Sequence, residues 1–340
     1  MLRIREQCLI ALLAMGCAWQ PVNAQNFSAV VAFGDSLSDL GNTFNDLGDD
    51  LSFFIIGYNS YYYDQGRWSD GPVWVEDLAQ LFGFEALQRN DGSNLYGTDF
   101  AWGGATSGDG HTFVPPGFHL SNLGTQVSTY IALLSKKNAR MPKVSQTLFT
   151  VWSGGNDVIY RVQEYFFYTP VPAQTIADNI GLAITRLYEA GGRYFLVPNL
   201  PPLGDKPNYR TDPKYRKEAN DYVAEYNPLL KSKLTELQKT LTGATIIWFD
   251  VYDLFKAVLA DPTPYKLVNV TEPAFTPDDT KHGGSVVPNP DQYLFWDTTH
   301  PTRVGHRIVA TAAYKAIMSA EPAFGQTHRV PLRSFSVAKD

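Results

Sequence analysis

The chain has 340 residues, of which 44% are hydrophobic and 18% are charged, so it can build a substantial core. Its formal net charge is −6 and its lysines and arginines form no cluster, which argues against nucleic acid as a partner. No apolar stretch reaches the roughly 20 residues that a membrane-spanning helix needs. We therefore expect an ordinary globular protein without a membrane span.

The N-terminal segment has the three parts of a secretory signal peptide. Arg3 and Arg5 give a positive start, residues 8–19 form an apolar run, and Val22-Asn23-Ala24 places small residues at the usual cleavage positions. We expect cleavage after Ala24 and a secreted or periplasmic protein.

This assignment leaves residues 1–24 as a signal peptide and residues 25–340 as a single domain, which we expect to be monomeric. Both cysteines, Cys8 and Cys17, lie in the segment that would be removed, which excludes a cysteine nucleophile in the secreted chain. The alternative is a lipoprotein anchored at Cys17, although Ala14-Met15 fits that cleavage pattern poorly.

Short apolar runs alternate with helical patterns along the rest of the chain. The apolar runs predict buried strands at 29–33, 148–152, 194–197 and 245–249. Apolar residues at helical spacing predict helices at 73–81, 176–190, 212–243 and 303–318, the third of them kinked or split at Pro228. This alternation indicates the α/β class, with a parallel sheet covered by helices on both faces.

Two segments interrupt the alternation. Residues 51–68 are rich in Phe and Tyr without a clean period, and residues 262–290 are rich in Pro, Thr, Asp and Gly. Both are predicted to be long loops, which in compact domains are often functional. The aromatic segment could either line a substrate site or pack over the edge of the sheet.

The first candidate for chemistry follows the first predicted strand, as Phe33-Gly34-Asp35-Ser36-Leu37-Ser38-Asp39. Active sites of parallel sheets form beyond the carboxyl ends of the strands, where a serine in a turn exposes its hydroxyl. By itself, however, Gly-Asp-Ser more often marks a simple turn in which Asp35 or Ser36 caps a helix.

The second candidate is Trp296-Asp297-Thr298-Thr299-His300-Pro301. A serine nucleophile needs a base to take its proton, and the base needs a third group that fixes its tautomer. Asp297 and His300, three residues apart in a tight turn, could supply both. Asp297 and Thr299 are also reasonable helix caps, so the pair alone is ambiguous.

Two glycine-bearing turns complete the set. Residues 100–106, Phe-Ala-Trp-Gly-Gly-Ala-Thr, let the backbone approach a ligand closely, so that a glycine N–H can serve as an oxyanion donor. Residues 153–157, Ser-Gly-Gly-Asn-Asp, follow a predicted strand and present an amide side chain at the carboxyl edge of the sheet. Gly-Asn is also a common turn pair.

Together these stretches resemble the conserved blocks of the SGNH (GDSL-type) hydrolases, in the same order and at similar separations. They match F-G-D-S-L-S-D, F-A-x-G-G-A-T, G-x-N-D and D-x-x-H-P-T, and residues 66–72 resemble the segment G-R-[FW]-S-[ND]-G. The resemblance spans Val30 to Ala316.

The resemblance implies a flavodoxin-like, three-layer α/β/α fold and the activity of a serine esterase or lipase. It implies Ser36 as nucleophile, His300 as base and then acid, and Asp297 as the group that orients His300. It also implies an oxyanion hole made by the N–H groups of Ser36 and Gly104 and the amide of Asn156. No metal and no organic cofactor are implied.

The family leaves the substrate open between a lipid or phospholipid acyl ester, an O-acetylated polysaccharide and a smaller ester. It also includes acyltransferases, and a catalytically silent carbohydrate- or surface-binding module is an alternative of another class. His111, His282 and His306 have no partners at metal-ligand spacing, so surface or loop positions are expected for them. Residues 45–50 lack the spacing of a calcium loop and are expected to be a solvated loop.

Overall fold

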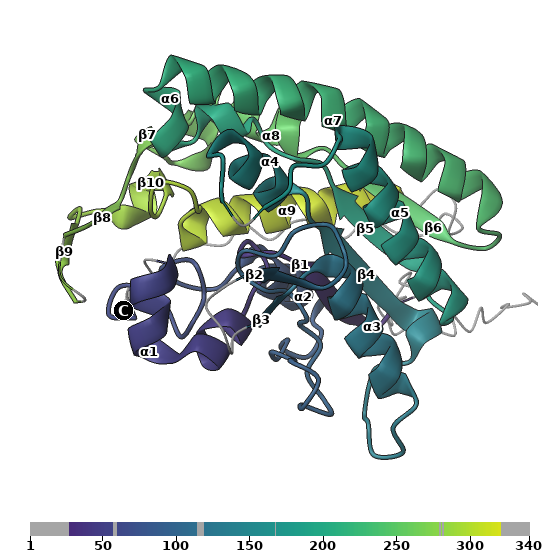
Figure 1. Ribbon diagram of the computed structural model, residues 1–340. Helices are drawn as coiled ribbons and strands as arrows, with labels where there is room; N and C mark the ends of the chain where they lie inside the picture. The colour runs from purple at the N-terminus through teal and green to yellow at the C-terminus, as the bar shows by residue number, and fades with distance from the viewer. Residues whose placement is uncertain are drawn as a thin grey trace, which may run out of the picture.

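A parallel sheet of four strands forms the centre of the computed structural model, in the order β1-β4-β5-β6 (Figure 1). The structure describes residues 27–56, 60–113, 119–166, 168–278, 280 and 282–320, so the predicted signal peptide lies outside it. The strands are β1 (Ala29–Gly34), β4 (Thr147–Trp152), β5 (Tyr194–Pro198) and β6 (Thr245–Phe249). Each predicted strand is confirmed to within one residue at either end.

The sheet is buried on both faces. Val31 of β1 pairs with Phe149 of β4, which pairs with Phe195 of β5, and all three are fully buried. Because successive residues of a strand point to opposite faces, Val31 packs into one core cluster and its neighbours Val30 and Ala32 into the other.

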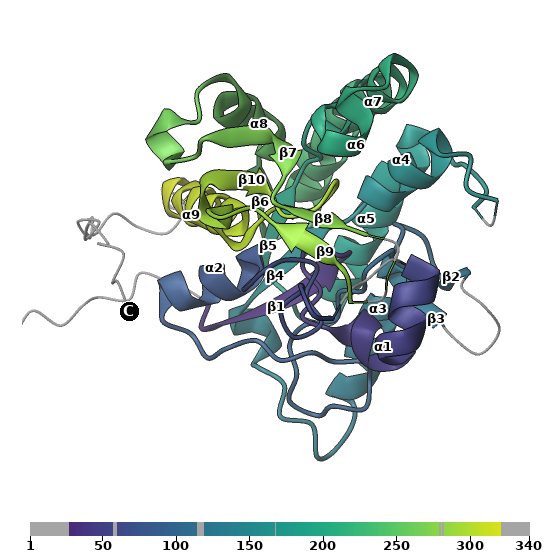
Figure 2. The same cartoon turned by 90° about the vertical axis from the view of Figure 1, so that its left-hand side faces the viewer.

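Helices cover both faces of this sheet, as Figure 2 shows along the strands. One face packs against α3 (Leu123–Leu134), α5 (Ala173–Glu189) and α7 (Pro213–Thr240). The other packs against α2 (Trp74–Phe82), α8 (Val251–Ala260) and α9 (Arg303–Ser319). The predicted α/β class with three layers is therefore confirmed.

Helix α7 contains Pro228 but is not split there. It runs as one helix from Pro213 to Thr240, so of the two effects expected of Pro228 the splitting was wrong. A proline inside a helix leaves the carbonyl four residues earlier, here that of Ala224, without its usual donor. Both residues are exposed, so water can take the place of that donor.

Helix α1 (Asn42–Ile56) occupies much of what was predicted to be loop. It includes residues 45–50 and the first part of 51–68. Gly48, with φ of 71°, interrupts the helical geometry. Because Gly48 interrupts the helix, the apolar residues before and after it do not follow one continuous helical period, and the sequence does not indicate a helix here.

The segment 262–290 is also more regular than predicted. It contains β7 (Asn269–Pro273), β8 (Phe275–Pro277) and β9 (Gly284–Val286). Strand β7 pairs with β10 (Tyr293–Phe295), while β8 and β9 form a hairpin that projects beside α1 in Figure 1. These strands are too short to show a clear period in the sequence.

The remaining strands and α-helices are small and lie at the carboxyl edge of the sheet or beside it. They are the hairpin β2 (His111–Phe113) and β3 (His119–Ser121), and the helices α4 (Gly155–Val162) and α6 (Pro207–Arg210). Among the described residues, no helix is both long enough and apolar enough to cross a membrane.

Candidate active site

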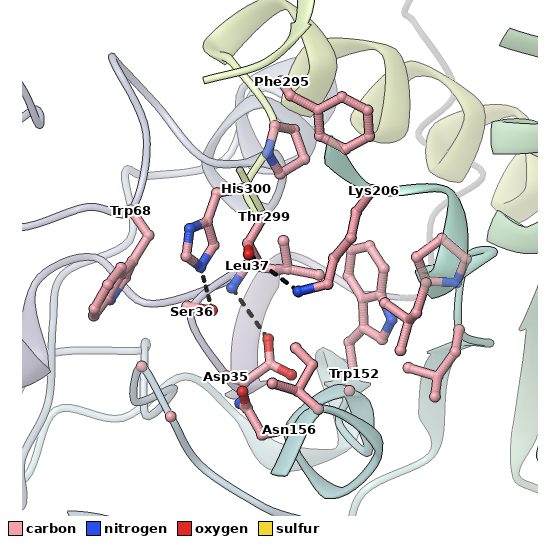
Figure 3. Close-up of a pocket in the computed structure, with 18 of the residues that line it drawn as sticks. Asp35, Ser36, Leu37, Trp68, Trp152, Asn156, Lys206, Phe295, Thr299 and His300 are labelled. Atoms are coloured by element: carbon pink, nitrogen blue, oxygen red, sulfur yellow. Dashed lines mark hydrogen bonds between the residues drawn. The ribbon is translucent and has the colours of Figure 1, made fainter. Parts of the chain in front are cut away.

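A pocket of about 360 Å³ opens at the carboxyl ends of the central strands (Figure 3). The segments that follow β1, β4, β5 and β6 all contribute to its wall, as expected for a parallel sheet. Most of the lining is apolar, and the polar groups that face it include Ser36, Asn156, Lys206, Thr299 and His300. An apolar cavity with a few convergent polar groups is the usual form of a small-molecule site.

Ser36 lies in a tight turn directly after β1. The carbonyl of Asp35 accepts from the N–H groups of Ser38 at 2.9 Å and Asp39 at 3.1 Å, which closes the turn. The strand before the turn must approach β4 closely, since a Cβ on Gly34 would lie 2.3 Å from the carbonyl oxygen of Trp152. Glycine is therefore required two residues before Ser36.

Ser36, His300 and Asp297 come together from the two ends of the described chain. Nε2 of His300 lies 2.9 Å from Oγ of Ser36, and Nδ1 lies 2.7 Å from Oδ2 of Asp297. With the proton of the neutral ring on Nδ1, the ring donates to Asp297 and Nε2 can accept the proton of the serine hydroxyl. The Trp68 ring packs against the imidazole, with centroids 5.1 Å apart.

The Asp297 carboxylate is fixed by several donors. Oδ1 accepts from the backbone N–H groups of Thr299 at 2.6 Å and His300 at 2.7 Å, while Oδ2 also accepts from the Tyr63 hydroxyl at 2.7 Å. Burial by itself would raise the pKa of Asp297, but the charge of His300 and these hydrogen bonds outweigh it and lower the pKa to about 2. Asp297 therefore stays ionised at neutral pH.

The three predicted oxyanion donors line the same pocket as the Ser36 hydroxyl. Asn156 stands in the first turn of α4, and its Nδ2 donates one hydrogen to the carbonyl of Ala105 at 2.9 Å, which leaves the second for another acceptor. Gly104 has φ of 79°, and its carbonyl accepts from the Tyr160 hydroxyl at 3.0 Å. In the described part of the chain the N–H of Ser36 donates to no group.

Asp39 connects the nucleophile turn to the glycine turn. Its Oδ1 accepts from the N–H groups of Gly41 at 2.7 Å and Asn42 at 2.6 Å, and its Oδ2 accepts from that of Gly103 at 2.8 Å. One buried carboxylate thus fixes Gly103, the neighbour of Gly104, relative to the segment that carries Ser36.

Two further carboxyl groups near the site have raised pKa values because of burial. The pKa of Asp35 is raised to about 7, and that of Asp157 to about 6. Asp157 accepts from the N–H and the hydroxyl of Ser107 at 2.9 and 3.1 Å and from the Tyr168 hydroxyl at 3.0 Å. It therefore braces the segment that follows Gly104 against α4.

Three residues that the sequence analysis did not single out also belong to the site. They are Tyr63, which binds Asp297; Gln126, which binds the backbone of Gly34; and Lys206, which lines the pocket. Of these, Lys206 had a usable signal in the sequence, because it follows the end of β5 at the same edge of the sheet. Tyr63 and Gln126 arrive from segments whose position depends on the packing.

The weaker candidates lie elsewhere. The surface or loop position expected for His306 was wrong, because this residue is buried in α9. Its Nδ1 accepts from the N–H of Trp74 at 3.3 Å, and burial lowers its pKa to about 3. The ring centroid of His282 lies 6.4 Å from that of Tyr61, outside the pocket. His111 lies in the hairpin strand β2. In the part of the chain that the structure describes, no group of three His, Cys, Asp or Glu side chains could hold a metal ion.

Comparison with known proteins identifies the family of the chain. A family model described as GDSL-like Lipase/Acylhydrolase matches residues 30–313. The GDSL esterase/lipase EXL2 of Arabidopsis thaliana is 28% identical over 87% of this chain and 89% of its own. The thermolabile hemolysin of Vibrio parahaemolyticus is 28% identical over 86% of this chain and 64% of its own length. Among solved structures, an acetylxylan esterase from Geobacillus stearothermophilus is 13% identical, with a TM-score of 0.45 over 85% of this chain and 94% of that one.

Proposed function

Because the chain belongs to the GDSL-like lipase/acylhydrolase family and is a carboxylic ester hydrolase, we propose that it cleaves its substrate through an acyl-enzyme on Ser36. The observation that supports this most strongly is the hydrogen-bonded series from Ser36 Oγ to His300 Nε2 at 2.9 Å and from His300 Nδ1 to Asp297 at 2.7 Å. It lies in the wall of an apolar pocket that can receive an ester.

In the first step, the proton of the Ser36 hydroxyl moves to Nε2 of His300 while Oγ forms a bond to the ester carbonyl carbon. The ring then carries a positive charge, which the ionised Asp297 stabilises. The carbonyl oxygen becomes an oxyanion, for which the N–H groups of Ser36 and Gly104 and the free N–H of Asn156 are the donors. The intermediate collapses as His300 protonates the leaving alcohol.

In the second step, water attacks the acyl carbon of the Ser36 ester and gives its proton to Nε2 of His300. The same three donors stabilise the second tetrahedral intermediate. When this intermediate collapses, the carboxylic acid leaves and the proton on His300 returns to Oγ of Ser36. The free enzyme is then regenerated, and the net reaction hydrolyses one ester bond with one water molecule.

A fluorophosphonate probe tests the acyl-enzyme directly, because it forms a stable bond to an activated serine. We expect the adduct on the peptide that contains Ser36, and neither labelling nor esterase activity in a folded Ser36→Ala protein. An adduct on Ser38 or Ser107, or a Ser36→Ala protein that retains wild-type turnover, would contradict the proposal.

We also propose that the protein is exported, with its N-terminus at Gln25 after cleavage. The support is the charged start, apolar run and small residues that precede this position. Sequencing the N-terminus of protein recovered outside the cytoplasm tests the cleavage site. A lipidated Cys17 at the new terminus would contradict free release.

For the substrate, we propose an ester whose apolar part occupies the pocket beside Ser36. Side chains such as Leu37, Leu200, Phe255 and Phe295 line it, so transfer of a hydrocarbon chain from water is favourable. A series of para-nitrophenyl esters from acetate to palmitate, with acetylated xylan as a second substrate, tests this. We expect kcat/KM to rise beyond acetate, and deacetylation of xylan without activity on longer acyl chains would contradict it.

A further inference from the structure

Lys206 places a buried cation in the wall of the catalytic pocket. Its residue is only 4% exposed, and Figure 3 shows the side chain extending into the pocket toward Thr299. Nζ donates to the hydroxyl of Thr299 at 3.1 Å and lies 3.9 Å from the centre of the Tyr209 ring. Within the described residues, no carboxylate comes within ion-pair distance of Nζ.

A lysine in this setting has unused binding capacity. An ammonium group has three hydrogen-bond donors, and the Thr299 hydroxyl takes one of them. Burial of a charge without a counter-charge is costly, and a hydroxyl and an aromatic ring offset that cost only in part. Consistent with this, burial lowers the pKa of Lys206 to about 7, although the charge of Asp297 acts in the opposite direction. An anion in the pocket would supply the missing partner.

The neighbouring carboxyl groups do not fill that role. Asp205 lines the same pocket, but its Oδ1 accepts from Nε and Nη2 of Arg216 at 3.0 and 2.8 Å. The Asp35 carboxyl group binds within the nucleophile turn, where its Oδ1 accepts from the N–H of Leu37 at 3.1 Å. Burial raises the pKa of Asp35 to about 7. The cation of Lys206 is therefore left facing the space that the substrate enters.

We propose that Lys206 determines specificity by binding an oxyanion of the ester substrate, a carboxylate or a phosphate carried near the scissile bond. This inference rests on the proposed function of the same pocket. Lys206 is bonded to Thr299, next to His300 in the sequence, whereas the partner of the Ser36 hydroxyl is His300 itself. It thus stands beside the reacting groups without being one of them. The apolar surroundings strengthen its attraction for an anion.

Matched pairs of esters test the proposal. One pair is para-nitrophenyl pentanoate and mono-para-nitrophenyl glutarate, which differ by a carboxylate at the end of the acyl chain. The other is monobutyrin and butyryl glycerol phosphate, which differ by a phosphate on the alcohol. We expect wild-type kcat/KM to favour the charged member of at least one pair, and the pair in which it does so identifies the source of the oxyanion.

The charge of Lys206 is then removed with Lys206→Met, and Lys256→Met serves as the control. Lys256 is an exposed lysine on α8 outside the pocket, so its replacement changes the net charge equally. We expect Lys206→Met to lower the ratio of kcat/KM for the charged ester to that for the neutral ester by about 10- to 100-fold, mainly through KM. Lys256→Met should leave this ratio at the wild-type value, and melting curves verify that both variants are folded.

A binding measurement separates this inference from the proposed catalytic mechanism. The Ser36→Ala protein is titrated calorimetrically with monomethyl glutarate and with methyl pentanoate. The titrations are repeated with the double variant that carries both Ser36→Ala and Lys206→Met. Stronger binding of the charged compound that disappears with Lys206→Met supports the inference even if turnover proves not to depend on Ser36. A wild-type protein that prefers the neutral ester in both pairs, or an equal ratio in Lys206→Met and Lys256→Met, would overturn it.

Discussion

The carboxamide of Gln126 binds both backbone groups of Gly34, with Oε1 accepting from its N–H at 2.9 Å and Nε2 donating to its carbonyl at 2.8 Å. Gln126 lies in α3, 92 positions along the chain, and is fully buried. The carbonyl of Gly34 also accepts from the N–H of Trp102 at 3.2 Å, so Gln126 is most important as the acceptor for the N–H of Gly34. Since Ser36 is two residues further on, this contact sets the direction in which the nucleophile turn begins.

Replacing Gln126 with Leu should therefore disturb both the fold and the reaction. The variant leaves the N–H of Gly34 buried without an acceptor, which costs about 1–3 kcal/mol of unfolding free energy. The Ser36 hydroxyl should also lose its fixed position, so we expect kcat to fall by about tenfold or more in the molecules that remain folded. Urea unfolding and steady-state kinetics on one preparation measure the two effects.

Gln238→Leu is the matched control. Gln238 also binds two backbone groups, accepting from the N–H of Ile246 and donating to the carbonyl of Ala244, both at 2.8 Å. It is an exposed residue beside β6, outside the pocket. Its loss should lower stability without changing kcat. If the two variants have equal kcat, Gln126 is a structural residue and does not position Ser36.

Tyr63 is expected to support Asp297 through its hydroxyl. In Tyr63→Phe the carboxylate loses a 2.7 Å hydrogen bond, so the pKa of Asp297 should rise from about 2. The carboxylate should then orient the His300 ring less firmly. One such bond corresponds to about 1 kcal/mol, so we expect kcat to fall roughly three- to tenfold.

The same variant should be more sensitive to acid. Because the folded pKa of Asp297 lies below its unfolded value, its contribution to stability is present above about pH 4 and is lost as the pH falls toward 2. Tyr63→Phe should move the midpoint of acid unfolding to higher pH. Tyr62→Phe removes a hydroxyl that donates to the carbonyl of Gly284 at 3.0 Å and should change neither kcat nor this acid sensitivity.

Most of the sheet could be predicted from the sequence because its strands are buried on both faces. All six residues of β4 are buried, and such strands appear as nearly continuous apolar runs that end at a turn. Since parallel strands end at one edge, the turns that carry Ser36 and Asn156 could be placed together before the structure was known. Asp297 and His300 were found for a different reason, namely their spacing in a motif.

The parts that could not be predicted depend on contacts between distant segments. Gln126 has the sequence context of any surface residue of a helix, and its role exists only because α3 packs beside the end of β1. Tyr63 follows α1, a helix that Gly48 interrupts, and it reaches Asp297 through an aromatic cluster with Phe275 and Trp296. Periodicity carries no information about such contacts.

Asp157 should give the stability of the protein an identifiable pH dependence. Burial raises its pKa to about 6, so between about pH 4 and pH 6 the folded state holds a proton that the unfolded state has released. Stability from this group therefore falls as the pH rises through that window. The unfolding free energy of the wild type relative to Asp157→Asn should decrease by about 3 kcal/mol from pH 4 to pH 7.

Asp91→Asn provides a control of opposite sign. Hydrogen bonds from Ser93 outweigh the effect of burial on Asp91 and lower its pKa, so its contribution to stability is lost as the pH falls. The unfolding free energy of the wild type relative to Asp91→Asn should increase as the pH rises. Urea unfolding at several pH values measures both differences, and a flat difference for Asp157→Asn would show that its carboxyl group titrates at an ordinary pKa.

Asn156→Ala should lower kcat far more than it raises KM. One hydrogen of the Asn156 amide is taken by the carbonyl of Ala105 at 2.9 Å, which orients the other toward the pocket that contains Ser36. Negative charge develops on the substrate oxygen only in the transition state, so the contribution of this donor belongs there. Loss of one oxyanion donor typically costs about 10² to 10³ in kcat, or roughly 3–4 kcal/mol. Some activity should remain, unlike in Ser36→Ala.

Asn90→Ala separates catalysis from structure in this test. Asn90 is buried, like Asn156, and lies outside the pocket. It also binds the backbone, donating to the carbonyl of Gly97 at 2.6 Å and accepting from the N–H of Gly92 at 2.9 Å. Its loss should lower the melting temperature and leave kcat unchanged. If Asn156→Ala behaves in the same way, with kcat within about threefold of the wild type, then Asn156 is a turn residue and the oxyanion is stabilised by the backbone N–H groups of Ser36 and Gly104.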